Sequence, residues 1–393
     1  MGNVVHYCRG SSEDALCDVL DNAVRLSGGS IPPSSLLVLG SIWYASGEFS
    51  NPTNSKLNSA LVKPVRLNPS SAPLQLNAGD YMRVHFNPRR FPIPPSSITV
   101  VRSDENLGYM VVDKPRGLPC HPTVDNAEEN LVEMLGGGEE GRYLGLPSRL
   151  DTDTRGLIVL ASDKKFASYF SRLLRGKTEG EVGVYQPNGG GVSNKALVTK
   201  LYRCCVCVGE EGVGRLEGLK GEVVKHWLEP SIRAPKVFRE EKGEDVEGKE
   251  WLECRLRVLE VGEVKGVKEG LGLVVKEGTR GIVEVEVELL TGRTHQIRGQ
   301  LSQLGYALVG DTPYFGEGEG EVEGALALEC SLLRFPRPKA VRFGEGEYEM
   351  SRKRRRAKKR GEMVEEEEYV VERDEEGEVK EWLEFKLERR PWV

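Results

Sequence analysis

Alternating apolar and polar positions predict strands in several parts of the chain. In 282–290, Val283, Val285, Val287 and Leu289 alternate with Glu284, Glu286 and Glu288. A period of two is typical of a strand with one buried face. Residues 156–161 are instead a continuous apolar run of the length of a buried strand, and 107–113 predict a strand closed by Lys114.

Two segments carry a helical period. The first follows 156–161, can be capped by Ser162 or Asp163, and has an apolar face made of Ala167, Phe170, Leu173 and Leu174. The second begins near Thr294 and presents Ile297, Leu301 and Leu304. Many strands with few long helices predict an α+β fold, built on a mixed, largely antiparallel β-sheet with a central cleft.

Composition shifts divide the chain into three parts. Residues 1–95 predict a small N-terminal domain that ends in the proline-rich linker 88–95. Residues 96–344 form the main domain, and 345–393 predict a charged, mostly disordered tail in which 382–387 can add a short strand. The tail carries eight basic residues within 352–360, followed by an acidic stretch at 362–378.

Charge and cysteine usage narrow the classes of protein. The formal net charge of −6 argues against nucleic-acid binding only as an average, because basic and acidic residues are segregated. No apolar run approaches the roughly 20 residues of a membrane span. Among the eight cysteines, Cys204 and Cys207 have C-x-x-C spacing, but no second pair of ligands stands at zinc-site spacing from them, so we expect free thiols in a reducing compartment.

Three segments combine groups that can perform chemistry. Residues 148–156 place an acid, arginines and hydroxyls just before a buried strand, and 200–203 begin another strand with a lysine and a tyrosine. Residues 290–298 turn at a glycine into a helix and bring arginines and a histidine to the helix N-terminus, which suits phosphate or carboxylate. Each segment alone is as compatible with turn capping or packing as with catalysis.

Taken together and in order, the motifs resemble RNA pseudouridine synthases of the RluA family. Residues 109–122 are similar to the family's opening strand and "NKPxGxxxHP" turn, and 149–157 to its "HRLDxxTSGL" signature. Residues 200–202 match "KxY", 291–298 match "TGRTHQIR", and 309–314 match "VGDxxY". Residues 78–92 and 226–236 resemble eukaryotic members, and the N-terminal domain resembles, weakly, an S4-like RNA-binding module.

The resemblance implies the pseudouridine synthase fold and isomerisation of uridine to pseudouridine in structured RNA, tRNA or rRNA. It implies Asp151 as the covalent catalyst, Tyr202 stacked on the uracil, and Arg293 as the cation paired directly with Asp151. It gives Arg149 the place in the base stack that a flipped uridine leaves. It implies four further substrate-binding residues: Thr154, His295, Ile297 and Arg298. We nevertheless expect His295, together with Gln296, mainly to support the turn.

No metal or organic cofactor is expected, and the protein is expected to be a monomer with no membrane association. The sequence leaves its compartment open, with cytoplasm or nucleus favoured and an organelle kept as the alternative. Ser148 departs from the family, which usually has histidine there, and Arg155 replaces a common serine. Two alternatives remain open at this point. One is a non-catalytic RNA-binding protein on the same scaffold, and the other is a nucleosidase that releases free uracil.

Overall fold

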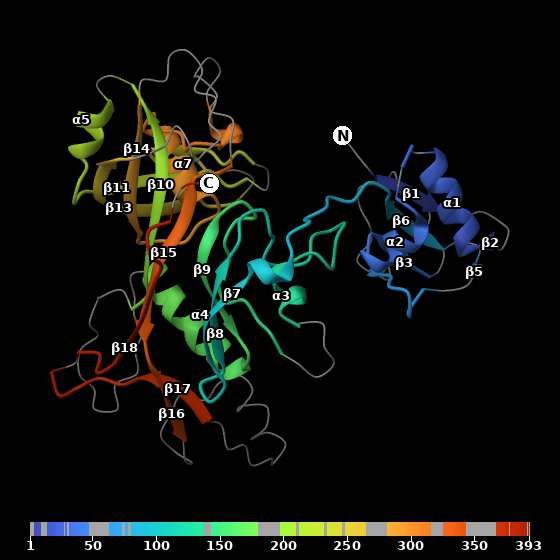
Figure 1. Ribbon diagram of the computed structural model, residues 1–393, viewed down its shortest axis with the longest axis horizontal. Helices are drawn as coiled ribbons and strands as arrows, with labels where there is room; N and C mark the ends of the chain where they lie inside the picture. Colours follow the sequence, from blue (N-terminus) through green and yellow to red (C-terminus); the bar gives the residue numbers. More distant parts are fainter. Residues whose placement is uncertain are drawn as a thin grey trace. The chain divides into compact units, whose positions relative to one another are not determined.

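The computed structural model describes residues 4–8, 14–26, 28–29, 31–46, 63–72, 75–77, 80–136, 143–179, 197–209, 212–231, 234–245, 248–264, 281–315, 325–342, 367–376, 378–390 and 392. The chain divides into two compact units, each built from two stretches of sequence. Unit 1 comprises Met1–Pro95 and Leu118–Arg142, and unit 2 comprises Ser96–Gly117 and Tyr143–Val393 (Figure 1). No helix in the described residues has the length and apolar character needed to cross a membrane.

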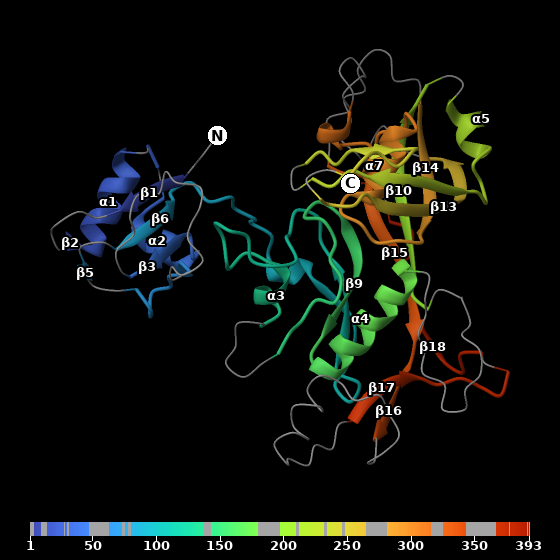
Figure 2. The same cartoon turned by 180° about the vertical axis from the view of Figure 1, so that it is seen from behind.

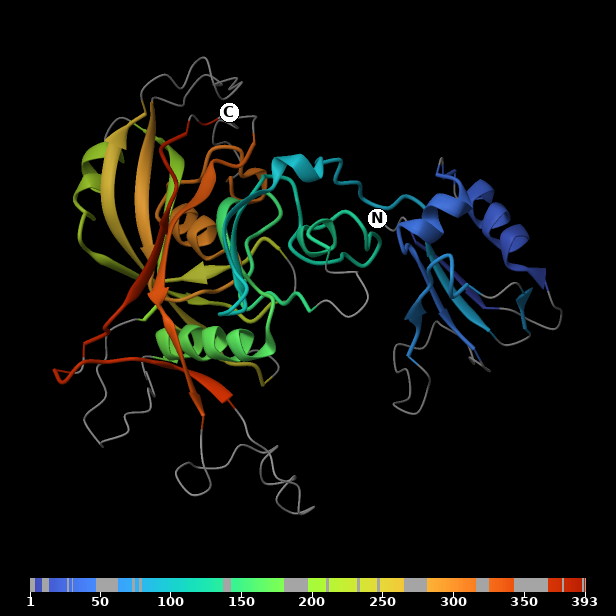
Figure 3. The same cartoon turned by 60° about the horizontal axis from the view of Figure 1, so that its bottom comes forward.

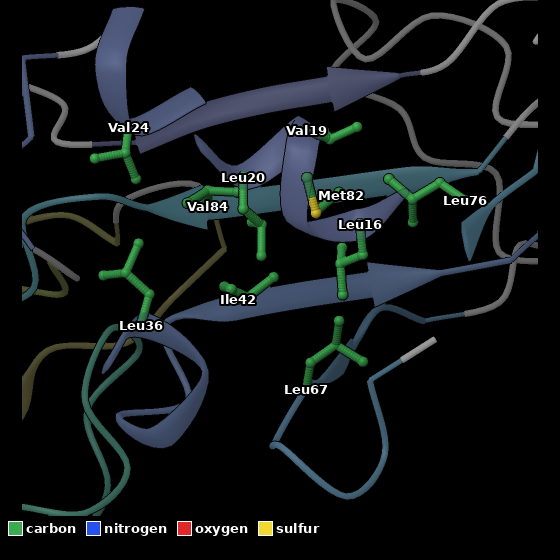
Figure 4. Packing of buried hydrophobic residues seen from close by; sticks show 10 residues of the cluster. All are labelled: Leu16, Val19, Leu20, Val24, Leu36, Ile42, Leu67, Leu76, Met82 and Val84. Carbon is green, nitrogen blue, oxygen red and sulfur yellow. The ribbon is translucent and has the colours of Figure 1, made fainter. Parts of the chain in front are cut away.

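Unit 1 contains a four-stranded antiparallel sheet in the order β1-β6-β3-β4, and β2 pairs separately with β5. Its elements are β1 (Val4–Cys8), β2 (Asp14–Ala15), α1 (Leu16–Leu26), α2 (Pro33–Val38), β3 (Ile42–Ala45), β4 (Val65–Arg66), β5 (Gln75–Leu76), β6 (Tyr81–His85) and α3 (Leu131–Met134). Apolar side chains from α1, α2 and the strands meet in one core, shown in Figure 4. Ile42, Met82 and Val84 of the sheet lie opposite Leu16 and Leu20 of α1 there. Unit 1 therefore has a core of its own.

Residues 118–136 fall in the interval that the sequence assigned to the main domain, yet they pack with unit 1. The hydroxyl of Ser41 donates a hydrogen bond to the carbonyl oxygen of Asp125 at 2.6 Å. The guanidinium of Arg90 also donates to the carboxylate of Glu129, from Nε to both oxygens at 3.0 Å and 3.1 Å and from Nη2 at 2.5 Å. The first stretch of unit 1 ends at Pro95, where the sequence places the boundary, but unit 1 also takes the later segment that begins at Leu118.

Unit 2 is built on a ten-stranded sheet in the order β12-β11-β13-β14-β10-β15-β9-β8-β7, with β18 added on β15. Its strands are β7 (Thr99–Asp104), β8 (Tyr109–Lys114), β9 (Arg155–Ala161), β10 (Thr199–Val208), β11 (Val223–Leu228), β12 (Phe238–Arg239), β13 (Leu252–Glu263), β14 (Gly281–Leu289), β15 (Leu328–Pro336) and β18 (Trp382–Lys386). All of the pairings are antiparallel except that of β15 with β9. The predicted mixed, largely antiparallel sheet of an α+β protein is confirmed.

The elements predicted from hydrophobic period are present with small shifts. In β14, Val283, Val285 and Val287 are buried and the glutamates between them are partly exposed, as the alternation required. Helix α4 (Lys164–Glu179) lies beside β9 (Figures 2 and 3), and its Phe166 ring stacks on Tyr109 of β8 with centroids 4.9 Å apart. The remaining helical elements are η1 (Pro95–Ser97), α5 (Gly212–Glu217), α7 (Gln296–Gln303) and η2 (Thr312–Tyr314). Helix α7 begins two residues later than predicted.

The C-terminal region differs from the expected disordered tail. Strand β16 (Pro338–Arg342) pairs with β17 (Glu367–Val371), and β18 joins the large sheet, so the described residues from 367 onward are structured. The short strand predicted at 382–387 is confirmed as β18. Apolar residues explain the order, because Tyr369, Val371 and Trp392 are buried. The basic run 352–360 lies outside the described residues, in the connection between β16 and β17.

Candidate active site

The loop that carries Asp151 is fixed from two sides. Its turn closes through a hydrogen bond of 3.2 Å from the Thr154 amide to the Asp151 carbonyl, and Thr154 is itself buried. Lys114, at the end of β8, is fully buried and its ammonium group donates to the carbonyl of Thr152 at 2.9 Å. The Asp151 side chain keeps 29% exposure, so a rigid loop presents a carboxylate that a substrate can reach.

A second loop leads into α7 and is held by a buried glutamine. The Gln296 side chain accepts hydrogen bonds from the Thr291 hydroxyl at 2.9 Å and the Arg293 amide at 3.0 Å, and donates to the carbonyl of Arg255 at 3.0 Å. His295 adopts φ 55°, a left-handed conformation that is uncommon for residues other than glycine. The glutamine network thus supports the turn, as predicted, and holds His295 in a strained conformation.

Arg298, in the first turn of α7, joins two carboxylates. Its guanidinium donates two hydrogen bonds to Asp311, at 2.8 Å and 2.7 Å, and a third to Oδ2 of Asp151 at 3.2 Å. The prediction that Asp151 pairs with Arg293 is therefore wrong: the arginine that pairs with Asp151 is Arg298. Within the described residues the Arg293 side chain makes no ion pair, and its Nε is buried without a hydrogen-bond partner.

The helix geometry explains this difference. Side chains of an α-helix lean toward its N-terminus, so a residue in the first turn reaches the loops in front of the helix. Arg298 occupies that position, whereas Arg293 lies in the turn before α7 begins at Gln296. The family resemblance assigned the pairing to Arg293, but the register of the helix places Arg298 beside Asp151.

The charges around Arg298 stabilise its cationic form. Burial alone would lower the pKa of Arg298, but hydrogen bonds and charge from Asp311, together with Asp151, raise that pKa above its ordinary value. Asp311 is itself buried. The pair Arg298 and Asp311 is therefore a charged anchor inside the protein, and Asp151 is attached to its accessible side.

His295 and Tyr314 form the other side of the site. The Tyr314 hydroxyl accepts a hydrogen bond from the Lys236 amide at 2.8 Å and lies 3.0 Å from Nδ1 of His295. With one lone pair used by Lys236, the hydroxyl can give its proton to Nδ1, which puts the neutral imidazole's proton on Nε2. That nitrogen lies 3.8 Å from Oδ2 of Asp151. Burial raises the pKa of Tyr314 to about 12, so the phenol stays protonated.

Tyr202 lies on β10 and is buried. It pairs with Cys330 of β15, and Cys330 pairs in turn with Gly156 of β9, so Tyr202 lies in a strand row close to the end of the Asp151 loop. Lys200, two residues before it, donates a hydrogen bond to the Ser148 hydroxyl at 2.9 Å. The serine that stands where the resembled family has histidine thus ties the Asp151 loop to β10. The role of Tyr202 stays a prediction.

The remaining predicted residues are spread between surface and core. Arg149 is exposed next to the Asp151 loop, whereas Ile297 is buried with 4% exposure in α7 and packs in the interior. Sequence reasoning gave no role to Lys114, Asp311 or Tyr314, although all three stand in the quoted motifs. The described residues contain no group of three or more histidine, cysteine or acidic side chains arranged to hold a metal ion.

Because burial lowers the pKa of His295, with Asp151 opposing the shift and Arg298 adding to it, acidification is expected to destabilise the fold. The unfolded chain takes the proton first, so this stability is complete above about pH 6.5 and is lost as pH falls below it. His295→Asn tolerates the left-handed conformation and should flatten the profile. Denaturant unfolding at about pH 7.5 and about pH 5.5 tests this. His226 also has a lowered pKa, but it is present in both the wild type and His295→Asn. If the free energy of unfolding depended on pH equally in the two proteins, the assignment to His295 would be contradicted.

Comparison with known proteins shows which family the sequence resembles. Residues 108–303 match the family model for RNA pseudouridylate synthase. RNA pseudouridine synthase 6, chloroplastic, of Arabidopsis thaliana is 30% identical over 256 residues, which are 60% of this chain and 45% of that protein. Ribosomal large subunit pseudouridine synthase D of Pseudomonas aeruginosa is 25% identical, over 61% of this chain and 60% of the relative.

The tRNA pseudouridine(32) synthase, mitochondrial, of Saccharomyces cerevisiae is 25% identical over 64% of this chain and 44% of its own length. The chain thus spans about half of the length of these relatives, from 44% to 60%. The matched region contains β8, β9 and β10, the Asp151 loop and α7. Through residues 108–303, the chain belongs to the RNA pseudouridine synthase family.

Proposed function

We propose that this protein converts uridines of structured RNA to pseudouridine and that Asp151 is its covalent catalyst. The observation that supports this most is the partly exposed Asp151 carboxylate, held on a rigid loop and paired with the buried Arg298. A nucleophilic carboxylate must stay ionised inside a pocket, and a neighbouring cation favours that form. Membership of the synthase family supplies the reaction class.

The two oxygens of Asp151 have different surroundings. Arg298 and His295 both approach Oδ2, and among the described residues no hydrogen bond reaches Oδ1. Oδ1 is therefore the oxygen that attacks C1′ of the ribose, or that takes a proton from the sugar to give an anhydro-sugar intermediate. Arg298 holds the other oxygen and fixes the direction of attack.

The steps conserve atoms and charge. In the nucleophilic route, Oδ1 forms a bond to C1′ while the bond from C1′ to N1 breaks and its electron pair leaves with the uracil. The base then rotates, C5 attacks C1′, and the carboxylate is released. The proton on C5 is removed and N1 gains one, so the product is an isomer. We assign Tyr202 to stacking on the uracil and to relaying the C5 proton.

Flipping a uridine out of a folded RNA costs a few kcal/mol. Arg149 is exposed and two residues before Asp151, so we assign it to the vacated place in the base stack. The substrate class is tRNA or rRNA, the classes named in the bacterial and yeast relatives. We propose that the protein acts as a monomer without a metal or organic cofactor. The names of two relatives specify chloroplasts and mitochondria, whereas cytoplasm or nucleus stays our prediction for this protein.

The test uses unmodified tRNA and rRNA transcripts incubated with the pure protein. After digestion to nucleosides, liquid chromatography with mass spectrometry measures pseudouridine, and free uracil is measured in the same sample. We expect pseudouridine to accumulate at a defined position with no uracil release. Free uracil with abasic RNA would indicate a nucleosidase instead. RNA binding without either product would indicate a non-catalytic binding protein.

A further inference from the structure

A cluster of charged side chains links the strands that surround the active site. Glu329 of β15 is fully buried, yet it makes ion pairs with three arginines: Arg155 at 3.1 Å, Arg203 at 2.5 Å, and Arg390. Arg155 begins β9 and Arg203 lies on β10, so this carboxylate connects three neighbouring strands. A buried carboxylate requires such cations, because desolvation opposes its charge.

The members of the cluster are sequence neighbours of residues at the candidate site. Arg203 follows Tyr202 on β10, and Asp113 precedes Lys114 on β8. Successive side chains of a strand point to opposite faces of the sheet. Arg203 and Asp113 therefore point toward the cluster, whereas their neighbours Tyr202 and Lys114 point to the other face. Arg155 begins β9 directly after the Asp151 turn. A shift of the cluster therefore moves the backbone that carries Tyr202, Lys114 and Asp151.

Arg390 comes from the C-terminal arm, defined here as residues 387–390 with Trp392. The arm continues β18, which runs antiparallel to β15 (Figure 1). The arm is held at several points: the Leu387 amide donates to Ser331, and Trp392 is buried with its Nε1 donating to Glu284 at 2.8 Å. The Arg155 guanidinium lies 4.9 Å from the Trp392 ring centroid. The arm is thus packed into unit 2, which contains the candidate active site.

Arg390 forms hydrogen bonds with two acids on different strands. It donates to Asp113 of β8 at 2.5 Å and 3.2 Å, and it also pairs with Glu329 of β15. Among the described residues, no other cation forms a hydrogen bond with Asp113. Without Arg390, Asp113 would have no hydrogen-bonded cation among the described residues, and Glu329 would lose one of its three arginines. The link between β8 and the Glu329 cluster would then be lost.

We propose that Arg390 is a positioning residue of the active site, which fixes β8, β9, β10 and β15 relative to one another from the side of the sheet opposite Lys114 and Tyr202. Its contribution to turnover rests on the proposed function, whereas its contribution to local order does not. Small displacements of catalytic groups can cost about a hundredfold in rate, so a residue remote from the substrate can control kcat.

The test compares Arg390→Ala with Arg389→Ala. Arg389 is the adjacent residue, its side chain is 75% exposed, and its one ion pair with a described residue is with Glu284, at 3.0 Å. Hydrogen exchange of the full chain is followed by mass spectrometry for peptides covering 148–160, 199–205 and, as an internal reference, 223–228. On the same samples, kcat and KM are measured well below the melting temperature. Arg390→Lys tests whether a positive charge without the planar guanidinium group restores local order and turnover.

For Arg390→Ala we expect exchange to accelerate in 148–160 and 199–205 but not in 223–228. We also expect kcat to fall by about ten- to a hundredfold while KM changes by less than about threefold. Arg390→Lys should lie between this variant and the wild type, and Arg389→Ala should match the wild type. Unchanged exchange in the first two segments, or equal acceleration in all three, would overturn the proposal.

Two further results keep the outcomes distinct. If Arg390→Ala does not fold, Asp113→Asn takes its place, because it weakens the same bridge while leaving the arm and Glu329 intact. Faster exchange in 148–160 for that variant supports the proposal, and no change overturns it. If the wild type makes no pseudouridine in any RNA, the proposed function fails, and the exchange pattern alone still decides the role of Arg390.

Discussion

Asp151→Asn is expected to abolish pseudouridine formation while RNA binding and folding persist. The amide has nearly the same shape as the carboxylate, but it is neither a nucleophile nor a base of useful strength. Arg298 keeps its two hydrogen bonds to Asp311, so the site should not collapse. Loss of the covalent catalyst typically costs at least about 10⁴-fold in kcat. Single-turnover assays measure the rate, and fluorescence anisotropy with labelled RNA measures the affinity.

Asp153→Asn is the matched control for this experiment. Asp153 lies in the same loop and loses the same charge, but its side chain is exposed and forms no ion pair with another described residue. We expect turnover within about threefold of the wild type, as for surface substitutions outside a network. A pure Asp151→Asn sample that still turned over at a tenth of the wild-type rate would refute the mechanism.

Arg298→Met is expected to combine a large loss of stability with loss of turnover. It leaves Asp311 buried without its arginine, and breaking a buried ion pair in this way costs about 3–5 kcal/mol. It also removes the cation beside Asp151. Urea denaturation measures the first effect, and the pseudouridine assay measures the second.

The double variant Arg298→Met with Asp311→Leu separates these two losses. Replacing both partners of a buried pair with apolar groups is often nearly neutral for stability, so much of the folding free energy should return. Turnover should not return, because Asp151 still lacks its cation. Arg293→Met should change stability by less than about 0.5 kcal/mol, since the Arg293 side chain has no ion pair among the described residues. If that substitution instead destabilised the protein as Arg298→Met does, the assignment of the anchor would be wrong.

Local patterns of sequence predicted much of the fold because they reflect burial. The alternating pattern at 282–290 corresponds to β14, and the predicted apolar helix face that includes Phe170 is buried in α4. The motif order also identified the two loops that meet at the site, since Asp151 and Arg298 both stand in quoted motifs. Which arginine reaches Asp151 depended on where α7 begins, and helix ends are set by contacts such as those of Gln296, not by period.

The C-terminal region was misjudged for a related reason. Acidic and basic residues dominate it, and such composition is typical of disorder. Its order comes from partners that are far away in sequence: β15 for β18, and Asp113 for Arg390. Composition averages over a window and cannot register a few buried contacts across more than 250 residues, such as the separation of 277 between Asp113 and Arg390.

The interleaving of the two units limits how this protein could have been assembled in evolution. Residues 118–142 belong to unit 1, while 96–117 and 143–393 belong to unit 2, so the chain passes between the units three times. A gene fusion at residue 95 would leave this segment without the surface formed by Ser41 and Arg90. The N-terminal unit is therefore not an exchangeable cassette. Removing residues 1–95 would take away the partners that Ser41 and Arg90 supply to Asp125 and Glu129.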